Sequence, residues 1–167
     1  MPVVDVSSSQ VLQKAFNTSS SKFQKNVSLS DLTKIWRAVG QAGDGEMSNR
    51  RGGLVPKFGT FTFNAAGKPI FVISDIFARS SRVTQTKVSL PGPRPKGKLN
   101  MSKLVQMTKY PKQMIEDSIK FIVKAYAEIV NKGRGASVRL GFHPVAEVTC
   151  NDMDVSSAFL PDFLARQ

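Results

Sequence analysis

Residues 53–63, GLVPKFGTFTF, carry the pattern that defines the fold. Apolar residues lie on both sides of Phe58-Gly59, which predicts two strands joined by a turn. The chain continues with NAAGK (64–68), which indicates a hairpin loop, and PIFVIS (69–74), which indicates a third strand. SDIFARS (74–80) then predicts a short helix capped by Ser74 or Asp75. We therefore expect three consecutive strands followed by a helix.

The end of the chain repeats this arrangement. PDFLARQ (161–167) echoes SDIFARS at an offset of 87 residues. The same offset places Phe142 on Val55 and Val145 on Phe58, and apolar positions continue to fall on apolar positions. A repeat of this kind indicates one structural unit used twice. The second unit has strands predicted within 136–150 and at 155–159, with NDMD (151–154) as a tight connection and 160–167 as a final helical turn.

Each set of strands is preceded by predicted helices. The first half has VLQKAF (11–16) and SLSDLTKIWRAVGQ (28–41), with Ser30 expected as the helix cap. Gly43 and Gly45 weaken a continuation of that helix by about 1 kcal/mol each relative to alanine. The second half has a short helix at 101–108 and a longer one at 111–135, which Gly133 and Gly135 are expected to end. MPVVDVSSSQ (1–10) is expected to be a polar tail, and NTSSSK (17–22) a loop.

The predicted fold is α+β, with two αα-βββ-α repeats packed as an intrachain pseudo-dimer. A unit of about 70 to 80 residues buries little surface alone, so a shared core is expected. The expected organisation is a tail with a short first helix (1–27), a first domain (28–82), a linker rich in proline and lysine (83–99) and a second domain (100–167). The predicted core residues are Leu32, Ile35, Trp36, Val39, Phe58, Gly59, Phe61, Ile119, Ile122, Tyr126, Phe142 and Val145.

Charge indicates an acidic partner. The chain has 24 lysines and arginines against 12 acidic residues, a formal charge of +12. No acidic residue occurs from Ile76 to Ile115, where nine basic residues occur. Pro91, Pro93 and Pro95 favour an extended path for the linker. The candidate partner-binding residues are Arg79, Arg82, Lys87, Arg94, Lys96, Lys98 and Lys103; the alternative is that the linker is only a solvated hinge.

The sequence offers little for catalysis. It has one histidine, His143, expected in a turn, and one cysteine, Cys150, expected as a buried strand thiol. Neither a catalytic triad nor a metal-ligand set can be assembled from them, so no catalytic, cofactor or metal site is predicted. A signal-peptide pattern and a long apolar run are also missing. We therefore expect a soluble, intracellular protein that is not an enzyme and that uses neither a membrane nor a small-molecule substrate.

Four motifs carry a family resemblance. LTKIWRAVGQ (32–41), VPKFGTFTF (55–63), KPIFVISDIFAR (68–79) and VTQTKVSLPG (83–92), followed by a degenerate second copy, resemble the tandem HU-like region of the coiled-coil domain-containing protein eighty-one family. The strand pattern with Phe-Gly-x-Phe after two helices also resembles the wider fold of the bacterial histone-like HU and integration host factor proteins. The coiled coil that names the family is absent from this chain, and the glycine-rich 41–53 departs from the family's helix.

The resemblance implies an interaction protein of centrosomes, basal bodies and cilia, whereas the bacterial relatives bend DNA. Bending requires a long basic β-arm with a wedging side chain. The corresponding connections here are only NAAGK and NDMD, so we expect weak, non-specific DNA binding without a bend. The expected function is a structural component of a ciliary, axonemal or centriolar microtubule assembly that binds tubulin or neighbouring filament proteins. A DNA-compacting protein and a soluble ciliary adaptor remain as alternatives.

Overall fold

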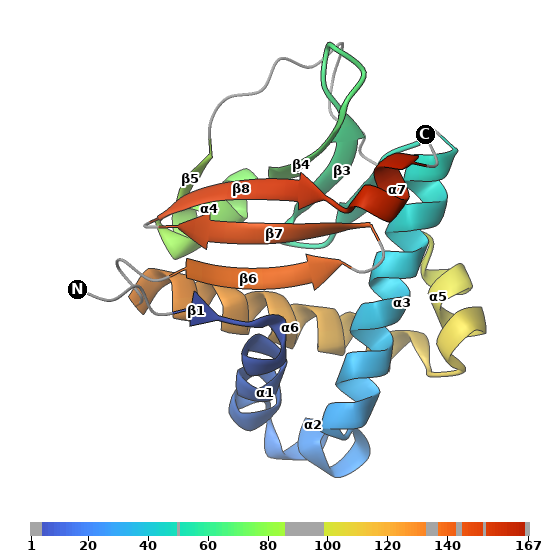
Figure 1. The fold of residues 1–167 in the computed structure, drawn as a ribbon. Coiled ribbons are helices and arrows are strands. Elements are labelled where there is room, and N and C mark those ends of the chain that lie inside the picture. Colours follow the sequence, from blue (N-terminus) through green and yellow to red (C-terminus); the bar gives the residue numbers. More distant parts are fainter. Residues whose placement is uncertain are drawn as a thin grey trace.

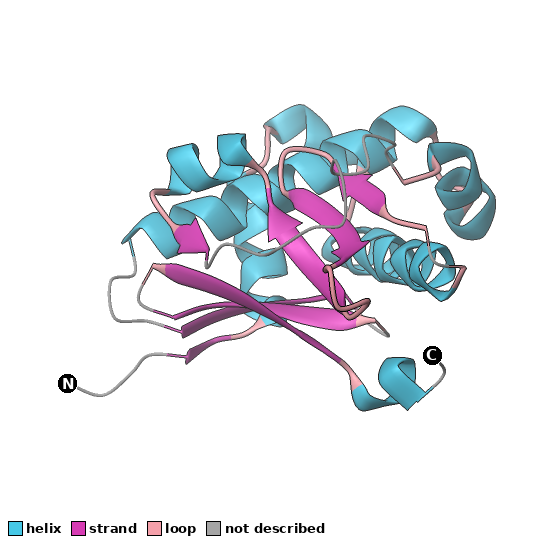
Figure 2. Ribbon diagram, turned by 90° about the horizontal axis from the view of Figure 1, so that it is seen from above, coloured by secondary structure: helices cyan, strands magenta, loops and turns pink. Residues whose placement is uncertain are grey.

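The computed structural model describes residues 5–49, 51–85, 99–132, 137–142, 145–151 and 153–165. Within these ranges the fold is α+β, and in each half helices are followed by an antiparallel sheet, which confirms the predicted α+β fold with two repeated units. Figure 1 shows the two sheets, with the long helix α3 crossing beside the long helix α6. Seen from above, the helices gather on one side of the larger sheet, except for the last one (Figure 2).

The first half contains the following elements in chain order: α1 (Ser8–Thr18), α2 (Ser21–Asn26), α3 (Leu29–Ser48), β2 (Gly53–Val55), β3 (Gly59–Phe63), β4 (Pro69–Ile73) and α4 (Asp75–Ser81). Strands β2, β3 and β4 form a three-stranded antiparallel sheet in which Phe61 lies opposite Phe71. Ser74 caps α4 by accepting a hydrogen bond from the backbone of Phe77. The Phe58-Gly59 region therefore joins two strands, as the sequence indicates.

The second half repeats this order with α5 (Met101–Thr108), α6 (Lys112–Lys132), β6 (Ser137–Phe142), β7 (Ala146–Asn151), β8 (Asp154–Phe159) and α7 (Pro161–Ala165). Its three strands pair antiparallel, and alternate residues of β6 point into the core. The turn predicted at His143-Pro144 and the helix stop predicted at Gly133 and Gly135 lie outside the described residues.

Two short strands from the first half extend the sheet of the second half. β1 (Asp5–Val6) pairs parallel with β6, and β5 (Thr84–Gln85) pairs parallel with β8, so the sheet has the order β1-β6-β7-β8-β5. The expectation of a loose polar tail is therefore wrong for residues 5–10, which form β1 and the start of α1. The reason is a tertiary contact, because β6 has an open edge whose backbone groups need hydrogen-bond partners.

The predicted loop at residues 17–22 is also wrong. α1 continues to Thr18, and α2 begins at Ser21, with Ser20 accepting a hydrogen bond from the backbone of Phe23. Ser19 is the C-terminal cap of α1 and Ser20 is the N-terminal cap of α2, so these polar residues mark helix ends rather than a loop. Phe23 is buried and packs against Phe121 of α6, with ring centroids 4.8 Å apart, so a tertiary contact holds this short helix.

Helix α3 differs from its prediction at both ends. Its cap is Ser28 rather than Ser30: Ser28 Oγ accepts from the backbone of Asp31, and the Asp31 carboxylate accepts from the backbone of Ser28. The helix also continues past Gly43 to Ser48. A Cβ at Gly43 would lie 3.0 Å from the Phe61 ring, so glycine lets β3 approach the helix closely. The packing gained there offsets the weak helix propensity.

One aromatic core joins the two halves. Phe142 of β6 packs against Trp36, Phe58, Phe61 and Phe71 of the first half, with ring centroids 4.9 to 5.7 Å apart. The following predicted core residues are buried: Leu32, Ile35, Trp36, Val39, Phe58, Gly59, Phe61, Ile119, Ile122, Tyr126, Phe142 and Val145. Burial raises the pKa of Tyr126, whose hydroxyl donates to the carbonyl of Val138 at 3.0 Å. The core is thus shared between the repeats rather than divided between them.

Polar side chains close the exposed edges where the halves meet. Gln85 accepts from the backbone N–H of Ile73 at 2.9 Å and donates to the carbonyl of Phe71 at 2.8 Å. On the other side of the molecule, Ser8 Oγ accepts from the Gly141 N–H, and the Trp36 indole donates to the Gly141 carbonyl, both at 2.7 Å. These side chains from the first half take the place of strand partners for β4 and β6.

A polar contact at the surface also links the halves. Asp31, at the start of α3, accepts hydrogen bonds from the backbone of Ser28 and from the hydroxyl of Tyr110, which lies between α5 and α6. These bonds hold the pKa of Asp31 below its ordinary value, the Ser28 backbone having the larger effect. The bond to Asp31 raises the pKa of Tyr110 above its ordinary value.

This contact predicts a loss of stability at both extremes of pH. A lowered carboxyl pKa stabilises the fold above the unfolded-state pKa, and the contribution is lost as the pH falls through the folded-state pKa, below about pH 4. A raised tyrosine pKa stabilises the fold below about pH 10, and that contribution is lost as the pH rises further. Urea unfolding of the parent and of Asp31→Asn should therefore show a stability difference at neutral pH that shrinks in acid. A difference independent of pH would contradict the assignment.

Candidate functional site

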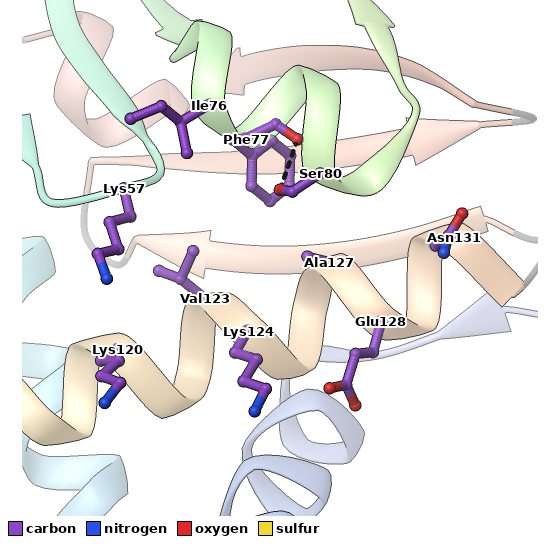
Figure 3. Close-up of a pocket in the computed structure, with 10 residues that line it drawn as sticks. All are labelled: Lys57, Ile76, Phe77, Ser80, Lys120, Val123, Lys124, Ala127, Glu128 and Asn131. Atoms are coloured by element: carbon purple, nitrogen blue, oxygen red, sulfur yellow. Dashed lines mark hydrogen bonds between the residues drawn. The ribbon is translucent and has the colours of Figure 1, made fainter.

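The candidate site is a groove between α4 and α6 (Figure 3). Its volume is about 300 Å³. Three elements line it: the β2–β3 turn, α4, and one face of α6. The lining residues are Lys57, Ile76, Phe77, Ser80, Lys120, Val123, Lys124, Ala127, Glu128 and Asn131.

The groove has an apolar floor. Phe77 and Val123 are buried beneath it, and Ala127 is half-buried beside them. Ile76 stands on α4 at the rim and is 59% exposed, an uncommon degree of exposure for isoleucine. The α4 sequence explains this arrangement, because consecutive helical residues point about 100° apart, so that Phe77 turns toward the core while Ile76 faces solvent. The floor can therefore receive an apolar side chain.

Lys57 reaches the groove from the turn between β2 and β3. The turn spans residues 56–58, and the N–H of Phe58 donates to the carbonyl of Val55 at 3.1 Å. Lys57 has φ of 63°, a left-handed conformation that is uncommon for residues other than glycine, asparagine and aspartate. Figure 3 shows its side chain extending from the turn toward α6. The turn is held tightly because Gly59 packs against the carbonyl of Val72, 2.5 Å from where a Cβ would stand.

Two further cations come from α6. Lys120 and Lys124 are four residues apart, a spacing that places them on the same face of the helix. Both are exposed, and Lys120 Nζ lies 5.7 Å from the centroid of the Phe121 ring. Together with Lys57 they form the lysine cluster of the groove. No member of this cluster has an ion-pair partner within the residues that the structure describes.

The acidic residues beside the groove are engaged elsewhere. Glu128 pairs with Lys14 of α1 at 3.9 Å. A second cavity of about 260 Å³ shares Lys57 and Lys120 with the groove and continues toward the start of α6, where Glu116 and Asp117 line it. Glu116 pairs with Lys112 at 3.8 Å, and Asp117 accepts from Gln113 at 2.9 Å. The acidic residues that line the two cavities thus each have another partner, whereas no ion pair is formed by the lysine cluster in the described part of the chain.

The structure does not unite the candidate binding residues predicted from the sequence. Arg79 lies on α4 and Arg82 directly after it, both exposed, while Lys103 lies on α5. Figure 1 shows α4 and α5 well apart. Lys103 extends over α3, since a Cβ at Gly45 would stand 3.0 Å from its Nζ. Lys87, Arg94, Lys96 and Lys98 lie outside the described residues.

Sequence reasoning missed the lysine cluster. None of its three lysines is among the candidate partner-binding residues predicted from the sequence. The spacing of Lys120 and Lys124 by itself indicates that the two side chains share one face of a helix. Their proximity to Lys57, more than 60 positions earlier, required the fold.

The described residues contain no group of three or more histidine, cysteine or acidic side chains placed to hold a metal ion. Cys150 is buried in β7. In the same part of the chain, no helix is both long and apolar enough to cross a membrane. The positively charged groove is thus the feature that the geometry equips for binding.

The connections that form DNA-bending arms in bacterial relatives are short here. β3 ends at Phe63 and β4 begins at Pro69. Asn64 Oδ1 closes this loop by accepting from the backbone of Ala66 and Lys68 at 2.9 and 3.0 Å. β7 ends at Asn151 and β8 begins at Asp154, with Asn151 and Asp154 paired across the turn. The first connection is a compact hairpin, and the second leaves no length for an arm.

The fold and these connections define a tandem HU-like binding protein without arms. Two family models match the chain: CCDC81 eukaryotic HU domain 1 over residues 9–85, and CCDC81 eukaryotic HU domain 2 over residues 96–167. The chain therefore belongs to the CCDC81 HU-domain family, which confirms the resemblance seen in the sequence. No curated protein sequence matches the chain significantly. HU-like domains are typically non-catalytic binding folds, and this family is eukaryotic.

Proposed function

We propose that the protein is a structural, non-enzymatic component of a ciliary, axonemal or centriolar microtubule assembly, where it binds tubulin or a neighbouring filament protein through basic surfaces. The observation that carries the proposal is the match of both halves to the CCDC81 HU domains, in a fold that lacks DNA-bending arms. The resemblance to that family implies centrosomes, basal bodies and cilia as the setting.

Charge supports an acidic partner in this setting. The chain carries a formal charge of +12, and tubulin is an acidic protein. The linker contributes Arg94, Lys96 and Lys98 to the excess of positive charge. Its prolines, Pro91, Pro93 and Pro95, restrict the backbone conformations that this part of the chain can adopt. A segment with fewer accessible conformations loses less entropy on binding, so more of the electrostatic attraction remains as affinity.

The proposal predicts that neutralising the linker weakens microtubule binding without unfolding the protein. The variant Arg94→Gln, Lys96→Gln, Lys98→Gln should melt like the parent but co-sediment less with microtubules and localise less to cilia. The expected loss is about tenfold if each of the three contacts contributes about 0.5 kcal/mol. A variant that binds and localises like the parent would show that the linker is only a hinge.

Experiments on the tagged parent protein distinguish the alternative functions. If the tagged parent neither localises to a cilium or centriole nor co-sediments with microtubules, the proposal fails. Co-purification of another ciliary protein without tubulin would indicate the adaptor function. Tight DNA binding with a bend at physiological salt would indicate a DNA-architectural function, whereas weak binding that disappears with added salt reports only phosphate contacts.

A further inference from the structure

We propose that the groove between α4 and α6 is a docking site for an acidic peptide segment of a partner protein. The segment places an apolar side chain on the floor formed by Phe77, Val123 and Ala127, and its carboxylates pair with the lysine cluster. This inference does not depend on the microtubule assembly proposed above. It concerns a different surface from the linker, and it holds for any partner that presents such a segment.

The apolar floor provides the first part of the argument. A space of about 300 Å³, at the lower end of the range for small-molecule pockets, has room for one or two apolar side chains of a peptide. Ile76 is 59% exposed directly beside it and would become covered by an incoming chain. Covering apolar surface stabilises a complex by about 25 cal/mol per Å² before the losses of entropy on association.

The arrangement of charge provides the second part. Lys57, Lys120 and Lys124 flank the floor, and none of them is neutralised by a carboxylate in the described part of the chain. The one carboxylate in the groove, Glu128, is already paired with Lys14. An anionic ligand therefore meets three cations and no uncompensated like charge at the floor. A basic segment would meet repulsion there, and a neutral apolar one would gain nothing from the lysines.

The shape of the site favours a peptide over a compact anion. The second cavity continues from Lys57 and Lys120 along α6 as far as Gln113, whereas the first reaches Asn131. At 1.5 Å of rise per residue this stretch of helix is about 27 Å long, which an extended chain of about eight residues spans. A single phosphate or a nucleotide would occupy only a fraction of that length. The acidic side chains Glu116 and Asp117 at the far end are already engaged by Lys112 and Gln113.

The test uses the full chain and a fluorescein-labelled peptide, Glu-Glu-Asp-Phe-Leu-Asp-Glu-Glu, with binding measured by fluorescence anisotropy at about 0.15 M salt. Two comparison peptides replace Phe-Leu by Ser-Ser or every acidic residue by lysine. We expect the first peptide to bind at least several-fold more tightly than the serine peptide, and the lysine peptide not to bind. Equal binding of the first two peptides would overturn the proposal, because charge alone would then explain the affinity.

Variants of the protein test whether the peptide binds in the groove. Lys57→Gln, Lys120→Gln, Lys124→Gln should weaken binding about tenfold or more. The matched control Lys22→Gln, Lys25→Gln, Lys68→Gln removes the same charge from exposed positions outside both cavities and should change binding less than threefold. Ile76→Ser, at an exposed position, should reduce the affinity for the Phe-Leu peptide to that for the serine peptide. If the two triple variants weaken binding equally, the interaction is a general effect of net charge and the groove is not the site.

Discussion

Trp36→Ala is expected to lower the free energy of unfolding by about 3 to 5 kcal/mol, the range for truncating a core aromatic residue. Trp36 is 4% exposed and packs on Phe142 with ring centroids 4.9 Å apart. Its indole N–H also donates to the Gly141 carbonyl at 2.7 Å. Removing the side chain leaves both a cavity and a buried carbonyl without this donor, so the two losses act together.

The measurement is urea unfolding followed by far-ultraviolet circular dichroism, because the variant lacks the only tryptophan. Trp36→Phe retains most of the apolar contact and loses the hydrogen bond, so it should lie between the parent and the alanine variant. Arg37→Ala, at the next and exposed position, should stay within about 0.5 kcal/mol of the parent. An alanine variant as stable as the parent would mean that Trp36 does not join the two halves.

The second large effect concerns the halves themselves. Residues 1–85 and 99–167, expressed separately, are each expected to lack a cooperative unfolding transition. Phe142 has four aromatic partners, all in the other half, and β1 and β5 belong to one half but complete the sheet of the other. Separation exposes this shared apolar surface to water and leaves the sheet edges without partners.

Mixing the two halves should restore a folded one-to-one complex, detected by size-exclusion chromatography and by dispersed amide resonances. The control is the full chain carrying a protease site between residues 86 and 98, which should stay folded after cleavage because the core contacts remain. If either half alone unfolds cooperatively with a stability close to that of the full chain, the repeats are independent domains and the shared core is not required.

Much of the fold could be predicted because its signals are local. The alternation in GLVPKFGTFTF and the helical spacing of Ile115, Ile119 and Ile122 depend on residues close together in the chain. The echo of SDIFARS in PDFLARQ lies 87 residues away, but each copy is a short contiguous stretch that can be compared directly. The predicted core residues Trp36 and Phe142 are among those that the structure buries. The errors arose where tertiary contacts override local preference, as at Gly43, where close packing of Phe61 keeps a weak helix position helical.

The candidate site was less predictable. The sequence composition indicated the basic linker as the binding surface, but all four of its charged residues lie outside the described ranges. The groove instead combines Lys57 from a turn with Lys120 and Lys124 from a helix of the other repeat. A run of charged residues can be recognised in a sequence because its members are contiguous. A cluster whose members are far apart in the chain cannot be recognised in this way.

The sequence alone therefore determined the tandem repeat, the order of the longer helices and strands, and the inward-facing residues, because periodicity and turn chemistry act over a few residues. Only the tertiary structure decided which strands complete each sheet and which cations share a surface. β1 and β5 are two residues long each, too short for any periodicity, and form because β6 and β8 offer open edges. The lysine cluster exists because α4 and the β2–β3 turn pack beside α6, a contact between residues far apart in the chain.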